Sequence, residues 1–287
     1  MMPAACTIII VNYNAGDHLA RCLASLAPAL TDWRWQAIVV DNASQDGSPN
    51  HARTHGDRVR LVRSDTNIGF GAGVNLGAAQ SRDPLILLLN PDAELEAGTV
   101  TALAAELDRH PECAIIGPGI LNDDGSVQGS ARGDPTLLTG LFGRTTGLSR
   151  LFPGSPLARR NVIAPDLVPA GARSLEVDWV SGACMLLRRD AFEEAGGFDP
   201  AYFLYWEDAD LCRRLRQRGR TIRYYPAVRV RHTVGVSSGT ARPASIRAFH
   251  ASALRYYTRH VARNAPERWL ATALLRTREW LKLLRRR

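Results

Sequence analysis

The chain has few cysteines, and none is placed as a metal ligand would be. There are five in 287 residues, an odd number, and no pair has the short spacing of a zinc site. Each lies among apolar neighbours, which predicts free, buried thiols in a reducing cytoplasm. They are Cys6, Cys22, Cys113, Cys184 and Cys212.

Long apolar runs are also missing. No stretch approaches the ~20 apolar residues that a helix needs to span a bilayer. A strand-like run begins at Cys6 with no basic segment and no cleavage site before it, so no signal peptide is predicted. Without a predicted membrane span or signal peptide, we expect a cytoplasmic catalytic body. The sequence also contains no internal repeat.

Residues 1–254 lack an excess of either charge. They contain 26 basic and 26 acidic residues, whereas residues 255–287 contain ten basic and two acidic ones, and the net charge is +8. A nucleic-acid-binding domain usually spreads its basic residues over a working face, so no nucleic-acid partner is predicted. A basic C-terminal segment suits an anionic membrane surface.

Apolar runs and helical spacings alternate in the N-terminal two-fifths of the chain. This alternation predicts an α/β fold with a doubly wound, mainly parallel sheet. The expected strands are Thr7–Val11, Gln36–Val40, Val59–Val62, Pro84–Leu89 and Ala114–Ile116, and the expected helices include Ala15–Leu30 and Gly98–Arg109.

The C-terminal half has a less regular pattern. Residues 129–174 are rich in Gly, Pro, Thr and Arg and are predicted to form a long loop. Further strands and short helices are expected at Val177–Val180, Ala183–Leu187, Asp190–Ala195, Asp208–Arg218, Thr221–Tyr225 and Val228–Arg231.

Polar residues directly follow three of the predicted strands. They are Asn12-Tyr13-Asn14, Asp41-Asn42 and Asn90-Pro91-Asp92. Ligands bind outside the carboxyl ends of parallel strands, so these residues predict one rim of one pocket. Asp41 fits either an acceptor for a nucleotide's ribose or base, or a turn residue.

Two motifs at this rim suit a nucleotide diphosphate. The glycine-rich stretch from Asn67 to Asn75 lets backbone amides approach a phosphate, although its spacing is not that of the dinucleotide fingerprint. Asp92 is placed to bind Mg²⁺ or Mn²⁺ bridging a diphosphate. The alternative for Asp92 is a turn that caps the next helix.

Three carboxylates fall within four residues at Glu207-Asp208-Ala209-Asp210, after a run of aromatic residues. An acidic first helical turn would explain the charges, because the helix macrodipole favours them. It would not explain the aromatic residues, which suit a sugar-acceptor site with a general base. His232, taken alone, is more typical of a structural histidine.

The order of these motifs resembles a known family. TIIIVNYN, VVDNAS, NIGFGAGVN, LLLNPDA, DWVSGACMLLRRDAFEEAGGFD, FLYWEDADLCRRL and RHTVG occur in sequence over residues 5–240. Together they resemble the family 2 glycosyltransferases of the GT-A fold, particularly the rhamnosyltransferase-like branch that builds bacterial cell-surface polysaccharides. The resemblance implies an inverting, metal-dependent enzyme that moves a sugar from a nucleotide diphosphate to a glycan or lipid-linked acceptor.

The resemblance also implies roles for individual residues. Asp208 would be the catalytic base, with an ordinary carboxylate pKa near 4 sufficing for that role. Asp92 and His232 would bind the metal, although Asn90 replaces the first aspartate of the family's Asp-x-Asp motif. The nucleoside would contact Tyr13, Asp41, Asn67, Gly73 and Asn75, and the sugar and acceptor would contact Trp179, Gly182, Trp206 and Glu207.

Two other function classes fit parts of the sequence. A nucleotidyltransferase also uses metal and a nucleotide-binding α/β domain, but usually has a basic glycine-rich loop after its first strand. A non-enzymatic sugar- or nucleic-acid-binding module leaves the two carboxylate motifs unexplained.

The predicted organisation is a GT-A domain over 1–240 and a basic helical tail over 241–287. The domain divides into a nucleotide-binding half (about 5–125), the long loop and a smaller acceptor-side half (175–240). In the tail, an amphipathic helix is expected from Asn264 onward. Its apolar stripe consists of Leu270, Leu274, Thr277, Leu281 and Leu284, with Ala273 and Trp280 alongside. This stripe would either lie on an anionic membrane or pack on the catalytic domain.

Overall fold

One ten-stranded sheet forms the centre of the computed structural model, which describes residues 5–135, 168, 171–233 and 242–284. The strand order along its main path is β3-β2-β1-β4-β11-β6-β12-β5. In addition, β7 pairs with β6 and β9 pairs with β12, and β10 and β8 form a separate two-stranded sheet. The strands are β1 Ala5–Asn12, β2 Arg34–Asp41, β3 Val59–Arg63, β4 Leu85–Leu89, β5 Ala93–Leu95, β6 Cys113–Leu121, β7 Val127–Gln128, β8 Ala131–Arg132, β9 Leu175–Glu176, β10 Trp179–Val180, β11 Cys184–Arg188 and β12 Thr221–His232.

The strands that carry the predicted pocket rim are parallel, as expected. β1 pairs in parallel with β2 and β4, and β2 with β3. β11 is antiparallel to β4, with Cys184 opposite Leu89, so the start of β11 lies at the end of β4. Likewise His232 at the end of β12 lies opposite Ala93. Residues far apart in the sequence therefore meet at one edge of the sheet.

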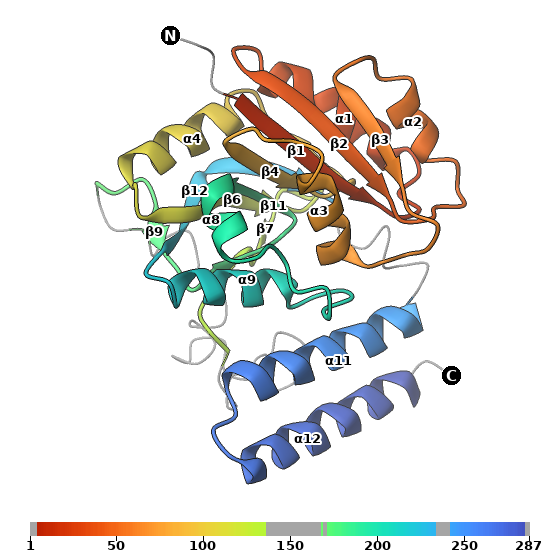
Figure 1. Ribbon diagram of the computed structural model, residues 1–287, viewed down its shortest axis with the longest axis vertical. Coiled ribbons are helices and arrows are strands. Elements are labelled where there is room, and N and C mark those ends of the chain that lie inside the picture. The colour runs from red at the N-terminus through yellow and green to blue at the C-terminus, as the bar shows by residue number, and fades with distance from the viewer. Residues whose placement is uncertain (1–4, 136–167, 169–170, 234–241, 285–287) are drawn as a thin grey trace.

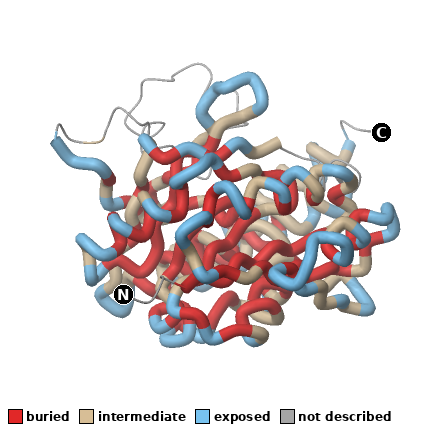
Figure 2. Tube along the Cα trace, turned by 90° about the horizontal axis from the view of Figure 1, so that it is seen from above, coloured by how far each residue is buried: buried red, intermediate tan, exposed pale blue. Residues whose placement is uncertain are grey.

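Helices cover both faces of the sheet, and the burial pattern of the strands requires this. In β1, Ile8 and Ile10 belong to one core cluster and Ile9 to the other, so both faces are apolar. Buried residues accordingly occupy the interior of the molecule (Figure 2). One face is packed by α1 His18–Ala29, α2 Pro49–Arg53 and α4 Thr99–Arg109, the other by α3 Phe70–Ala78, α8 Arg189–Glu194 and α9 Glu207–Arg216.

The C-terminal segment forms a helical hairpin, α11 Arg242–His260 and α12 Ala265–Leu284. α11 lies between α9 and α12, and α12 packs on α11 (Figure 1). The predicted amphipathic helix is confirmed as α12, but α11 was not predicted as a separate helix. Its apolar residues follow no single stripe, because it packs on the domain on one side and on α12 on the other.

The apolar stripe of α12 does not pack on the catalytic domain, contrary to one of the two predictions. Ala271 is buried against α11, whereas the stripe residues are exposed. Exposed fractions are 53% for Leu270, 39% for Leu274, 45% for Leu281 and 43% for Leu284. Trp269 (78%) and Trp280 (60%) extend the exposed stripe on the same face of α12.

Other expectations differ in detail. The two strands predicted at 221–231 are one strand, β12, with an irregularity between Tyr225 and Arg229. Much of the predicted loop 129–174 lies outside the described residues, although β8 forms a short strand inside it. All five cysteines are free and buried, as predicted.

Candidate active site

The ends of β1 and β2 are joined by Asn12 and Asp41. The Asp41 side chain is fully buried; its Oδ1 accepts a hydrogen bond from Asn12 Nδ2 (3.0 Å) and its Oδ2 accepts one from Arg63 Nε (3.2 Å). Tyr13 follows Asn12 and is half-buried. A buried carboxylate with two partners is more than a solvated turn residue, because its desolvation must be offset by hydrogen bonds.

The glycine-rich turn before α3 is tied to β2 and to the loop before α9. Asn67 Oδ1 accepts a hydrogen bond from Gly69 N (3.0 Å), and Asn42 Nδ2 donates to Gly69 O (3.0 Å). Gly69 has a φ of +87°, and a Cβ there would collide with the carbonyl oxygen of Phe203. Gly73 packs against β1. Only glycine allows this turn to lie so close to the loop that precedes Asp208.

Asn75 lies on α3 but is used differently from the prediction. Its Nδ2 donates to Phe198 O (2.8 Å) and its Oδ1 accepts from Phe198 N (2.9 Å). Both ends of the amide therefore hold the chain before α9 against α3. A nucleotide contact of Asn75 stays a prediction that this arrangement does not favour.

Asp92 and His232 lie side by side at the ends of β4 and β12. His232 Nε2 is 3.2 Å from Asp92 Oδ1 and 3.2 Å from Asn90 Nδ2. On its other side, His232 Nδ1 contacts Gln128 Oε1 (3.0 Å), and Gln128 Nε2 donates to His232 O (2.7 Å). In the neutral ring, an acceptor at Nδ1 places the proton on Nδ1, and the Nε2 lone pair then faces Asp92 and the Asn90 amide.

This arrangement fits a divalent cation. A lone pair and a carboxylate oxygen that face each other at this distance are stabilised by a cation between them, and a second hydrogen bond commonly orients a metal-binding histidine. Among the described residues no group of three or more His, Cys, Asp or Glu side chains forms a complete metal site. Mg²⁺ and Mn²⁺ sites often have one or two protein ligands, with substrate phosphates supplying the others.

Asp208 lies in the first turn of α9, next to the start of β11. Its Oδ2 accepts a hydrogen bond from Gly182 N (3.1 Å) and its Oδ1 accepts one from Ala209 N (2.8 Å). Ala183 O in turn accepts from Asn90 N (2.9 Å), so two successive residues connect Asp208 with the end of β4. Burial raises the pKa of Asp208 above its ordinary value, which corrects the expectation of an unperturbed carboxylate.

Glu207 is buried between α9 and α3, although the resemblance placed it near the acceptor. It is 5% exposed, and its Oε2 has no hydrogen-bond partner among the described residues. Burial, together with the nearby Asp208 carboxylate, raises the pKa of Glu207 well above its ordinary value. Burial thus favours the neutral form of Glu207 over its ionised form.

The raised pKa of Glu207 predicts a pH-dependent effect of Glu207→Gln on stability. A carboxyl group with a raised pKa in the folded state favours folding at low pH, and that contribution is lost as pH rises above ~4.3, the ordinary Glu value. Glutamine does not titrate. We therefore expect the variant to gain melting temperature relative to wild type as pH rises from 4 to 8. Calorimetric scans across this range test it; a constant difference would contradict it.

The two tryptophans assigned to the sugar and acceptor have different surroundings. Trp179 Nε1 donates to Gly133 O (3.2 Å), and the Arg132 guanidinium lies over its ring, 5.2 Å from the centroid. Trp206 packs instead against α11, with ring centroids 5.2 Å from Tyr256 and 5.9 Å from Phe249. Its backbone has a φ of +70°, so the residue that directly precedes α9 is held in a strained conformation.

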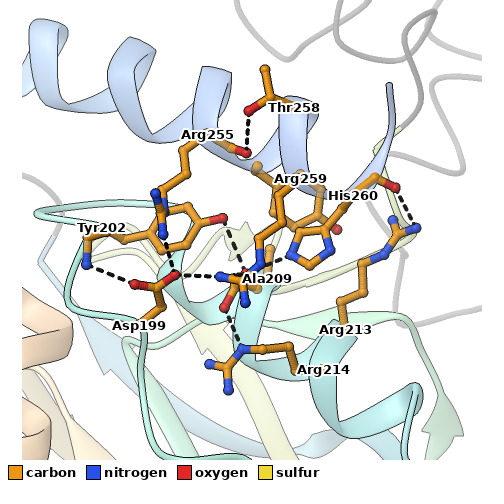
Figure 3. A network of polar contacts seen from close by, with 12 residues as sticks. Asp199, Tyr202, Ala209, Arg213, Arg214, Arg255, Thr258, Arg259 and His260 are labelled. Carbon is orange, nitrogen blue, oxygen red and sulfur yellow. Dashed lines mark hydrogen bonds and ion pairs between the residues drawn. The ribbon is translucent and has the colours of Figure 1, made fainter. Parts of the chain in front are cut away.

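A network of polar contacts joins α9 to α11; Tyr202, Arg214 and His260 of this network are labelled in Figure 3. These three residues all contact Asp210. Asp210 is fully buried; His260 Nε2 lies 2.6 Å from its Oδ1, Arg214 Nε donates to its Oδ2 (2.7 Å), and the Tyr202 hydroxyl donates to Oδ1 (3.2 Å). Asp210 therefore has a structural role. The contacts of Gln128 with His232 and of His260 with Asp210 were not predicted from the sequence, because neither Gln128 nor His260 lies in a recognisable motif.

Comparisons with known proteins identify the family of the chain. The family model described as glycosyl transferase family 2 matches residues 7–196, and the model described as glycosyl transferase family group 2 matches residues 163–284. The chain is a family 2 glycosyltransferase. It is 34% identical over 290 residues to the N-acetylglucosaminyl-diphospho-decaprenol L-rhamnosyltransferase of Mycobacterium tuberculosis, covering 96% of this chain and 91% of that protein.

Solved structures show the same fold at low sequence identity. The crystal structure of GalNAc-T7 with UDP, GalNAc and Mn²⁺ matches with a TM-score of 0.61 at 14% identity, over 92% of this chain and 52% of that one. The mannosyltransferase PcManGT from Pyrobaculum calidifontis, in complex with GDP-Man and Mn²⁺, matches with a TM-score of 0.58 at 17% identity, over 96% and 70%. The family 2 glycosyltransferase described here thus has the predicted GT-A fold.

Proposed function

We propose that this glycosyltransferase moves rhamnose from dTDP-rhamnose to a hydroxyl of a lipid-linked glycan, with inversion, in cell-surface polysaccharide synthesis. The observation that carries the proposal is the link from Asp208 through Gly182 and Ala183 to the strand end that bears Asp92. It brings a candidate base next to a candidate diphosphate site. The similarity to a mycobacterial rhamnosyltransferase supports the sugar and the acceptor class.

In this mechanism Asp208 accepts the proton of the acceptor hydroxyl while that oxygen attacks the anomeric carbon. The bond from the anomeric carbon to the diphosphate breaks in the same step, and a single displacement with one base inverts the configuration. A raised pKa makes Asp208 a stronger base than an exposed aspartate. The raised pKa of Glu207 disfavours a second negative charge beside Asp208.

Asp92 and His232 would hold the divalent cation, Mg²⁺ or Mn²⁺. When bound, the cation supplies positive charge that stabilises the departing diphosphate. Gln128 keeps the His232 ring oriented for this contact. Asp41, Tyr13 and the glycine-rich turn would hold the nucleoside at the ends of β1 and β2.

Donor preference tests the proposed reaction. Turnover of dTDP-rhamnose, UDP-sugars and GDP-sugars would be compared in the presence of Mg²⁺ or Mn²⁺, with a lipid-linked N-acetylglucosamine acceptor. The proposal expects the highest kcat/KM with dTDP-rhamnose. Faster transfer from a UDP- or GDP-sugar would contradict the rhamnose assignment and leave glycosyl transfer intact.

Asp92→Ala is expected to weaken nucleotide diphosphate binding only when metal is present. Loss of the carboxylate removes a metal ligand, so affinity for dTDP with Mg²⁺ should fall at least tenfold and affinity in chelator should stay nearly constant. Calorimetry in both conditions measures this. Equal losses in both would mean that Asp92 contacts the nucleotide instead of the cation.

We further propose that the enzyme works at the cytoplasmic face of the membrane, held there by α12. Within the described chain, no helix is both long and apolar enough to span a bilayer. The exposed stripe of α12 points away from α11, and tryptophan and leucine opposite arginine suit the headgroup boundary. Peripheral binding would bring a lipid-linked acceptor within reach of the enzyme.

Replacing both Trp269 and Trp280 with serine is expected to reduce binding to anionic liposomes by at least tenfold. These two rings are the largest apolar side chains exposed on α12, at 78% for Trp269 and 60% for Trp280. Flotation with Val127→Ser, an exposed apolar residue on β7, serves as the control. Unchanged recovery of the double variant, or no binding of wild type, would remove the membrane proposal.

A further inference from the structure

A groove runs between α11 and α12 on the side next to the exposed stripe. Its volume is about 450 Å³. Leu254 and Leu275 form apolar parts of its wall, and Arg247, Arg255 and Arg276 also line it. The full lining is Arg247, His250, Ala251, Leu254, Arg255, Thr258, Leu275, Arg276 and Glu279.

The groove carries more positive than negative charge. Three arginines line it against one carboxylate, that of Glu279. Arg247 and Arg276 are exposed and have no ion pair with any described residue. Arg255 shares the Asp199 carboxylate with Arg259, so that carboxylate is divided between two guanidinium groups. An anion, and above all a phosphate, would be stabilised here by arginine donors.

His250 adds a buried, unpartnered polar atom to the lining. The residue is 2% exposed, its Nδ1 lies 2.7 Å from Ile246 O, and its Nε2 has no hydrogen-bond partner among the described residues. A buried polar atom without a partner costs free energy. A bound molecule with a hydroxyl group would provide one.

The groove lies beside the exposed stripe of α12, and this position indicates which kind of molecule would bind in it. Arg276 lies on the helical wheel of α12 between the groove residues Leu275 and Glu279 and the exposed stripe that contains Trp269 and Trp280. If the stripe enters the headgroup boundary, the groove opens beside it at headgroup depth. A lipid would then place its phosphate among the arginines and its glycerol hydroxyl near His250.

We propose that the α11–α12 groove is a binding site for the phosphate headgroup of an anionic membrane lipid. The inference rests on the proposed binding of α12 to an anionic membrane. It adds a specific lipid-binding site to the non-specific attraction between basic side chains and the membrane surface. The site lies on the opposite side of α11 from Trp206, so it is separate from the catalytic residues.

The test compares two double variants that remove the same charge. Arg247→Gln with Arg276→Gln changes the groove, and Arg60→Gln with Arg82→Gln removes two exposed arginines of the catalytic domain that also lack ion pairs with described residues. Binding to phosphatidylcholine vesicles with and without 30% (about one lipid in three) phosphatidylglycerol is measured. Because each basic residue contributes about 1 kcal/mol near such a surface, we expect a loss of roughly 10- to 30-fold for the groove variant alone.

Equal losses in the two variants, or none in the groove variant, would overturn the site. A second arm adds a short-chain phosphatidylglycerol below its micellar concentration, or inorganic phosphate at the same concentration, and follows Trp fluorescence. Equal effects of both would assign the groove to free phosphate and overturn the lipid assignment. Donor hydrolysis by all variants is measured in parallel, so a failure of the proposed catalytic function is seen separately.

Discussion

Asp208→Asn is expected to lower kcat by about 10²–10⁴-fold, because loss of a positioned general base has effects of this size. Asparagine has nearly the same shape, and its amide oxygen can still accept one of the two backbone hydrogen bonds, the one from Gly182 N or the one from Ala209 N. The site should therefore remain intact, and the dissociation constant of the donor should change little. Steady-state transfer and calorimetric donor binding measure the two quantities separately.

Glu207→Gln is the matched control for this experiment. It is the same chemical change one residue earlier, at a carboxyl group that is already protonated over more of the pH range. Its effect on kcat should be within about tenfold, since it removes no base. Asp208→Asn with more than a tenth of wild-type turnover would move the base elsewhere, and a large loss in Glu207→Gln would make Glu207 the candidate.

The parallel part of the fold was predictable because each of its strands is buried on both faces. Runs such as Thr7–Val11 are continuously apolar, and no other arrangement of short strands and helices buries them as well. The less predictable parts depend on tertiary contacts. β5 and β8 have two or three residues each and exist because β12 and β10 lie beside them. α11 lacks a clear stripe because it is covered from two sides.

The candidate site was predictable where a side chain ends a strand, and less so where its surroundings decide its role. Asp92, His232 and Asp208 follow from position and from the family pattern. Nothing in the sequence indicates that Asn75 binds Phe198 backbone, that Glu207 is buried, or that Gln128 orients His232. The contacts of Asn75 and Gln128 join residues that are 123 and 104 positions apart in the chain and that the sheet brings together.

Asp210 illustrates the same limit. It belongs to the same Glu207-Asp208-Ala209-Asp210 motif as the candidate base, and the sequence alone does not tell the two aspartates apart. Burial opposes its ionisation, but hydrogen bonds from His260 and Arg214 outweigh burial and lower the pKa of Asp210. A lowered pKa means that the ionised group stabilises the folded state at neutral pH. This contribution is present above the ordinary Asp value of ~4 and is lost as pH falls through the lower folded-state value.

Asp210→Ala is expected to reduce the free energy of unfolding by about 3–5 kcal/mol at pH 7, because it leaves Arg214 buried without its counter-ion. The matched control is Asp199→Ala, which breaks ion pairs with Arg255 and Arg259 that are each more than two-fifths exposed; it should cost about 0–1 kcal/mol. Urea unfolding measures the loss of unfolding free energy in each variant. The loss in Asp210→Ala should become smaller at acidic pH, where the Asp210 carboxylate of the wild type is protonated. A loss below 1 kcal/mol in Asp210→Ala would show that α9 does not depend on this network to hold Asp208 in place.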